Sequence, residues 1–199
     1  MTISKNPITS KTYTIPADLD DSKNINRFIS RNMGKKIIIV QGLGFVGAVM
    51  SLVCANALNE DYAVIGVDLA NENTYWKIKS INDGVFPLNA DDPKISDFFD
   101  NAKAKGNLLA TYDPLAYQYA DVIIVDVNLD VQKETNEKGD LKGFDVNLNG
   151  FKVAIQSIGA NCRDDVLVLV ETTVPPGTCA QVVKPLLEHE LVKRDLTLE

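Results

Sequence analysis

Three glycines near residue 45 have the spacing of a phosphate-binding loop. The stretch reads GxGxxG and consists of Gly42, Leu43, Gly44, Phe45, Val46 and Gly47. A β-branched run precedes it and an apolar run follows, so a strand should lead into the loop and a helix should leave it. Gly42 permits the tight turn, Gly44 lets the backbone approach a pyrophosphate, and Gly47 lets helix and strand pack closely. We expect these six residues to bind a dinucleotide through free N–H groups at the helix start. The alternative is a tight turn that needs glycine only for its backbone angles.

An acidic residue follows the second predicted strand, where a dinucleotide ribose would lie. Asp68 comes directly after the apolar run at 62–67. Its carboxylate can accept hydrogen bonds from both adenosine ribose hydroxyls and would repel a 2′-phosphate. The next four residues, LANE, contain no arginine. The sequence therefore predicts NAD as the cofactor in preference to NADP, the alternative being a solvated aspartate in a loop.

The elements needed to position these groups alternate along the chain. Apolar runs predict strands, and longer amphipathic or apolar stretches predict helices between them. This alternation indicates an α/β fold, a Rossmann-type doubly wound parallel sheet with helices on both faces, and a ligand at the switch point beside the first strand. We expect a surface loop over the polar residues 130–143. The predicted strands are 36–41, 62–67, 108–112, 122–127 and 166–170, and the predicted helices are 45–58, 149–160 and 178–191.

Length and composition favour one domain with an added segment. The 199 residues suit one large domain, which we place at 35–199, with residues 1–34 as an N-terminal extension. Within the extension, residues 16–32 could form a short helix with an apolar stripe of Ile25, Phe28 and Ile29. We expect the extension either to pack on the main domain or to stay mobile.

The overall charge and the cysteines exclude several classes of partner. The net charge is −7 and no basic cluster occurs, so we expect neither nucleic acid nor an anionic membrane as a partner. No run of eighteen apolar residues predicts a membrane span. The three cysteines form no CxxC pair, which argues against a metal site and favours a reducing, cytoplasmic location.

Three further segments resemble the UDP-glucose/GDP-mannose dehydrogenase family. Residues 77–88 (KIKSINDGVFPL) are similar to its K…LN.G..P segment, and residues 108–113 (LLATYD) to its L.AT.D segment. Residues 170–178 (VETTVPPGT) are similar to its E-S-T-V-P-P-G-T segment, which is the most specific of the three. The segments occur in the family's order over about residues 36–190.

The resemblance implies roles for four further residues. Thr111 would contact the cofactor, and Thr172 would place its hydroxyl beside the nicotinamide. Thr173 matches the threonine that assists catalysis in the family, so it is the one catalytic residue that we predict in this chain. Glu171 is either a site carboxylate or a residue that simply ends a strand. The alternative for the threonines is that they cap the following helix.

The resemblance also implies a reaction. The family oxidises the C6 alcohol of a nucleotide sugar to a uronate with two NAD⁺, and a cysteine of a second domain traps the aldehyde. We expect the substrate to be a UDP-sugar, such as UDP-glucose or a UDP-N-acetylhexosamine, used in polysaccharide biosynthesis. No cysteine here matches the nucleophile and the chain ends where the catalytic segments begin, so we expect this chain to be inactive alone.

One departure from the family keeps other functions open. The fourth strand usually ends in a VPTP-like turn that borders the cofactor, whereas residues 125–130 read VDVNLD. The main alternative is therefore a non-enzymatic NAD-binding regulatory module, and a further one is another hydroxyacid or sugar-acid dehydrogenase. An exposed sheet edge makes a homo-oligomer possible.

Overall fold

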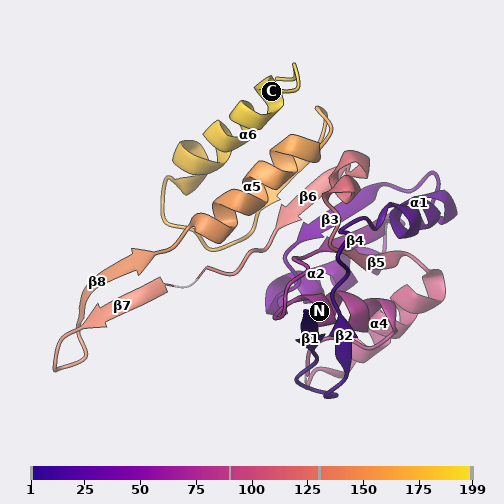
Figure 1. Cartoon of the computed structure of the whole chain (residues 1–199), viewed down its shortest axis with the longest axis horizontal. Coiled ribbons are helices and arrows are strands. Elements are labelled where there is room, and N and C mark those ends of the chain that lie inside the picture. The colour runs from indigo at the N-terminus through magenta and orange to yellow at the C-terminus, as the bar shows by residue number, and fades with distance from the viewer. Residues whose placement is uncertain (1, 90, 130, 198–199) are drawn as a thin grey trace.

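A parallel sheet of five strands forms the centre of the computed structural model, which describes residues 2–89, 91–129 and 131–197 (Figure 1). The strand order β5-β4-β3-β6-β9 places the first sheet strand in the middle, so the predicted doubly wound topology is confirmed. The sheet strands are β3 (Ile37–Gln41), β4 (Ala63–Val67), β5 (Leu108–Thr111), β6 (Val122–Val125) and β9 (Leu167–Val170).

The central strand β3 is buried along its whole length because strands and helices surround it. Ile37–Gln41 pairs in parallel with Ala63–Val67 on one side, and Ile38–Gln41 pairs with Val122–Val125 on the other. A strand buried on both faces requires a continuous apolar run, which is the pattern of this segment. The carboxyl ends of β3, β4 and β6 consequently lie together at one edge.

Helices cover both faces of the sheet. One face packs against α1, α5, α6 and the short 3₁₀ helix η1, and the other packs against α2, α3 and α4. The 3₁₀ helix begins after Asp113, because the Asp113 side chain accepts a hydrogen bond from the Leu115 N–H and proline follows the cap. The helices are α1 (Ser22–Arg31), α2 (Phe45–Ala55), α3 (Tyr75–Asn82), α4 (Pro93–Lys105), η1 (Pro114–Tyr119), α5 (Asn149–Asn161) and α6 (Lys184–Val192), the last preceded by a π-helical turn, η2 (Cys179–Val183).

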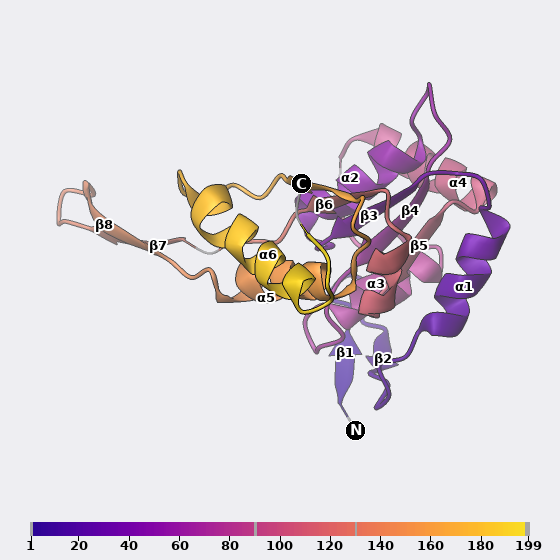
Figure 2. The ribbon, with the colours of Figure 1, turned by 90° about the horizontal axis from the view of Figure 1, so that it is seen from above.

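The N-terminal extension packs on the body of the protein. It consists of an antiparallel hairpin, β1 (Ile3–Lys5) with β2 (Thr12–Thr14), followed by α1, whose Ile25 and Phe28 are buried as the apolar stripe predicted. The hairpin lies against α3, and Figure 2 shows α1 beside β5. No sequence pattern predicted the hairpin, because its strands are only three residues long.

A second hairpin replaces the surface loop predicted at 130–143, so that prediction is wrong for the described residues of the segment. Strands β7 (Val131–Thr135) and β8 (Leu141–Val146) pair antiparallel and extend away from the sheet in Figure 1. Asn136 and Gly139 close the turn, and Gly139 takes a φ of +84°. The polarity of this segment correctly predicted its position at the surface. An Asn-x-x-Gly turn between polar strands nevertheless forms a hairpin without needing a core.

Among the described residues, the longest helices span thirteen residues, and none combines the length and hydrophobicity of a membrane-crossing segment.

Candidate dinucleotide-binding site

A cavity of about 570 Å³ lies at the carboxyl ends of the central strands. Gln41 and Gly42 line it at the end of β3, Val67 and Asp68 at the end of β4, and Asp126 directly after β6. The switch point of a doubly wound sheet is where ligands bind, because the loops of neighbouring strands diverge there. The cavity therefore occupies the position that the sequence predicted for a cofactor.

Two glycines of the loop are required by close backbone packing. Gly42 has a φ of +99°, and a Cβ on it would lie 2.5 Å from the carbonyl oxygen of Asp126. A Cβ on Gly47 would lie 1.9 Å from the carbonyl oxygen of Gly42. Distances this short cannot be accommodated without moving backbone. Both glycines thus have the turn and packing roles expected of them.

The middle glycine has a different environment. Gly44 lines the cavity and is the N-cap of α2, and a Cβ on it would meet no atom within 4 Å. Phe45 and Val46 begin the helix, and their exposed side chains are apolar. These two residues can therefore bind an anion only through their backbone N–H groups. Open space before a helix N-terminus fits a bound phosphate group.

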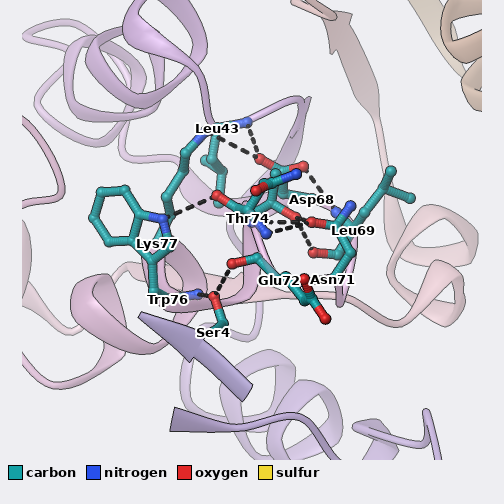
Figure 3. Close-up of polar contacts among 10 residues, drawn as sticks. Ser4, Leu43, Asp68, Leu69, Asn71, Glu72, Thr74, Trp76 and Lys77 are labelled. Carbon is teal, nitrogen blue, oxygen red and sulfur yellow. Dashed lines mark hydrogen bonds and ion pairs between the residues drawn. The ribbon is translucent and has the colours of Figure 1, made fainter. Parts of the chain in front are cut away.

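Asp68 is held by the glycine loop itself (Figure 3). Its Oδ2 accepts a hydrogen bond from the Leu43 N–H at 3.0 Å, and its Oδ1 accepts one from the Leu69 N–H at 2.8 Å. Burial raises the pKa of this carboxyl, and the two N–H donors and Lys77 act in the opposite direction. Each oxygen keeps a lone pair for a further donor such as a ribose hydroxyl.

Lys77 also lines the cavity, although sequence reasoning assigned it no role. Its Nζ lies 4.0 Å from Oδ2 of Asp68, and its side chain is mostly buried. The signal was available, because Lys77 opens the segment that resembles K…LN.G..P. The Lys77 ammonium offsets part of the charge of the Asp68 carboxylate and adds a hydrogen-bond donor to the same wall of the cavity.

Two tyrosines that sequence reasoning did not select also border the cavity. Tyr112 packs against Tyr75 in a tilted arrangement with ring centroids 5.7 Å apart, and burial raises the pKa of Tyr112 to about 12. Tyr117 is buried and its hydroxyl donates a hydrogen bond to Gln41. Both hydroxyls therefore stay protonated at neutral pH and provide a neutral, partly apolar wall.

The structure does not bring Thr111 to the cavity. Its side chain is fully buried and its hydroxyl donates a hydrogen bond to Oδ2 of Asp21 at 2.7 Å. The Asp21 N–H in turn donates to Oδ2 of Asp113 at 2.8 Å. Thr111 thus connects β5 to the N-terminal extension. This extension lies outside the segments that resemble the family.

The segment after β9 lies beside the cavity without lining it. Thr172 is half-buried, and its hydroxyl lies 3.0 Å from the carbonyl oxygen of Val125 and 3.1 Å from that of Val127. Thr173 and Glu171 are exposed. Thr172 consequently fixes the ends of β6 and β9 to each other, and Thr173 is the threonine with an exposed side chain.

Asp126 is the cavity residue that fits an anion-binding site least well, because its side chain is acidic. It lines the cavity beside Gly42 and Gly47 but is only 8% exposed, and its Oδ2 has no hydrogen-bond partner among the described residues. Burial raises the pKa of its carboxyl, and the negative charge of Glu171 adds to this shift. The altered turn is visible in the sequence, but no sequence pattern predicted a buried carboxyl there.

Comparisons with known proteins agree with this arrangement. The model of the UDP-glucose/GDP-mannose dehydrogenase family, NAD binding domain, matches residues 35–198. GDP-mannose 6-dehydrogenase from Pseudomonas syringae pv. tomato is 33% identical over 156 residues, which are 76% of this chain and 31% of that protein. UDP-N-acetyl-D-mannosamine dehydrogenase from Methanococcus aeolicus is 29% identical over 145 residues, 73% of this chain and 29% of that protein.

Solved structures show the same similarity. A ternary complex of GDP-mannose dehydrogenase from Pseudomonas aeruginosa superposes with a TM-score of 0.57 at 30% identity, over 76% of this chain and 32% of that one. An NDP-N-acetyl-D-galactosaminuronic acid dehydrogenase from Methanosarcina mazei shares the fold, with a TM-score of 0.65 at 24% identity, over 83% and 33% of the two chains.

The chain spans about a third of the length of the curated relatives it matches. The matched third is their N-terminal part, and it contains the glycine loop and the cavity described above. The chain therefore belongs to the UDP-glucose/GDP-mannose dehydrogenase family, and residues 35–198 are its NAD-binding domain.

Proposed function

We propose that this chain is the cofactor-binding part of an enzyme that oxidises the C6 hydroxyl of a nucleotide sugar to a carboxylate. The observation that carries the proposal is the meeting of Gly44, the start of α2 and Asp68 in one cavity. The similar proteins named above are dehydrogenases of GDP-mannose and UDP-N-acetyl-D-mannosamine. The substrate class that follows is a nucleoside-diphosphate sugar, with a UDP-sugar as the more specific expectation from the sequence.

Each part of the cavity would bind a different part of NAD. The N–H groups at the start of α2 would bind the diphosphate, because the helix dipole and free donors both favour an anion. The free lone pairs of Asp68 would accept hydrogen bonds from the adenosine ribose, and Tyr112 would form the wall beside the adenine. When bound, NAD accepts the hydride that leaves the sugar carbon.

The residues after β9 would serve the reacting end of the cofactor. The exposed hydroxyl of Thr173 is free to contact nicotinamide or substrate, whereas that of Thr172 is bonded to backbone. We therefore propose that Thr173 is the catalytic residue of the pair and that Thr172 positions it. The negative charge of Glu171 would lie at the same, reacting end of the cofactor.

We further propose that the chain alone binds NAD without oxidising a sugar nucleotide. A nucleophilic cysteine needs exposure and a lowered pKa. Burial raises the pKa of Cys54 to about 11 and also raises that of Cys162. Cys179 is exposed but does not match the family's nucleophile, so the thiol of the reaction would come from another polypeptide segment.

A regulatory NAD-binding module is the second candidate function. The altered turn after β6 favours it, since a buried carboxyl replaces the turn that borders the cofactor in the family. Such a module would bind NAD and change its affinity for a partner protein. It would not need the exposed Thr173 beside the cavity.

A paired binding and turnover experiment tests the proposal. The chain is titrated with NADH in a calorimeter and then incubated with NAD⁺ and UDP-glucose, UDP-N-acetylmannosamine or GDP-mannose while NADH absorbance is followed. We expect binding with no turnover, and turnover only after the polypeptide that carries the catalytic cysteine is added. Failure to bind NADH would contradict the proposal, and binding with no turnover even in that complete enzyme would favour the regulatory module.

A further inference from the structure

A carboxyl group lies where the site should bind an anion. Asp126 follows β6 and contributes to the same cavity as Gly42 and Gly44. Its Cβ would be 3.1 Å from a Cβ placed on Gly47, in the first turn of α2. The side chain thus packs directly against the start of the helix that would bind a diphosphate, and an ionised carboxylate here would repel that diphosphate.

The surroundings of Asp126 do not support a negative charge. Its Oδ2 is buried and accepts no hydrogen bond from any described residue. A buried carboxylate without donors is costly, whereas the carbonyl oxygen of a neutral carboxyl can remain unpartnered at a much smaller cost. The neutral form has one O–H left to donate. This geometry favours a carboxyl that offers a proton to a ligand.

The neighbouring titratable groups favour the same form. From the end of β9, the charge of Glu171 raises the pKa of Asp126, and burial contributes more strongly. From α2, Cys54 has a pKa near 11 and stays neutral. The other titratable groups on the cavity wall are Asp68, Lys77, Tyr112 and Tyr117. Lys77 is paired with Asp68, and among the described residues no cation lowers the pKa of Asp126.

We propose that Asp126 binds the cofactor diphosphate as a neutral carboxyl, with Oδ1 donating a hydrogen bond to a phosphate oxygen. The inference rests on the proposed binding of NAD by this chain. Molecules that carry an ionised Asp126 must take one proton from solvent onto the carboxyl when NAD binds. NAD affinity consequently falls as pH rises above the pKa of Asp126, with a limiting slope of about tenfold per pH unit.

Proton uptake provides a direct test. NADH is titrated calorimetrically into the chain at several pH values, in buffers with different ionisation enthalpies, so that the protons bound per NADH are measured. We expect uptake by the wild type that approaches one proton at high pH. Asp126→Asn should bind NADH with little dependence on pH and without this uptake, because its amide donates at every pH.

Two further variants separate Asp126 from other sources of uptake. Asp100→Asn, the same change on the exposed face of α4, should retain the wild-type uptake. Glu171→Gln removes the charge that favours protonation, so it should move the midpoint of the affinity profile to lower pH. This shift can be measured even if Asp126→Asn does not fold.

The outcomes are distinct. NADH binding without proton uptake in the wild type, or equal uptake by Asp126→Asn, would overturn the role of Asp126 while leaving NAD binding intact. An unchanged midpoint in Glu171→Gln would also count against it. No NADH binding at any pH would contradict the proposed function and this inference together.

Discussion

The backbone N–H of Leu43 donates a hydrogen bond to Oδ2 of Asp68 at 3.0 Å, which joins the middle of the glycine loop to the end of the next strand. The Leu43 side chain is fully buried in the core shared by α2 and α3. The loop that we propose binds the diphosphate is therefore already ordered by Asp68, the residue that we propose binds the ribose. Such preorganisation reduces the entropy lost when a ligand binds.

Two glycines of this loop should respond differently to a single methyl group. Gly47→Ala places a Cβ 1.9 Å from a backbone oxygen, so we expect the free energy of unfolding to fall by about 3 kcal/mol or more. Gly44→Ala places its Cβ in open cavity space and should leave stability nearly unchanged while weakening NADH binding. Urea denaturation and NADH titration of both variants check this. Equal loss of stability in the two variants would contradict the account.

The hydrogen bond between Thr111 and Asp21 should stabilise the protein without serving the cofactor. Thr111→Val removes a donor from a buried carboxylate and should cost about 1–3 kcal/mol of stability. A double-mutant cycle with Asp21→Asn should give a coupling energy, since the two side chains are in contact. Asp18→Asn, an exposed change in the same extension, is the control. A strong loss of NADH affinity at unchanged stability would instead make Thr111 a cofactor ligand.

The buried carboxyl of Asp126 should make stability depend on pH. Its pKa is higher in the folded protein than in the unfolded chain, so the folded state holds the proton more tightly. The stabilisation from this group is full below the unfolded pKa and is lost as pH rises through the folded pKa. Relative to wild type, Asp126→Asn should therefore gain stability as pH rises. Urea denaturation across this range measures the difference, and parallel curves would exclude the effect.

The two threonines after β9 should separate into a structural and a catalytic residue. Thr172→Val removes the hydroxyl that donates to the carbonyls of β6 and its following turn, and should lower stability by about 1 kcal/mol. Thr172→Ser should restore it. Thr173→Val should leave stability unchanged and lower the turnover number in the complete enzyme. Reversed effects on stability would show that the assignments must be exchanged.

Much of this fold could be predicted because its signals are local. Continuous apolar strands identify a buried parallel sheet, and glycines at fixed spacing identify the loop between β3 and α2. The two hairpins could not be predicted, since their short or polar strands have no periodic core face. Helix α4 was also not identified, although Asp92 caps it, Pro93 opens it and Gly106 ends it.

The site could be predicted only in part, for a related reason. Motif spacing identified Asp68 and the glycines, because in the sequence each comes directly after a predicted strand. The role of Thr111 depended on Asp21, ninety positions earlier, and the burial of Asp126 depended on the packing of the first turn of α2 against the segment after β6. Contacts between residues so distant in sequence leave no spacing signal in one chain.

The most direct test of the central claim is the cofactor preference of the chain, measured by calorimetric titration with NADH and NADPH. The wild type should bind NADH and exclude NADPH, because Asp68 repels a 2′-phosphate. Asp68→Ala should lose about tenfold or more in NADH affinity and gain NADPH binding, since Lys77 then faces the cavity without its carboxylate partner. Lys77→Gln in that background should remove the gain. Tighter binding of NADPH than NADH by the wild type, or an Asp68→Ala variant with unchanged NADH affinity, would contradict the account.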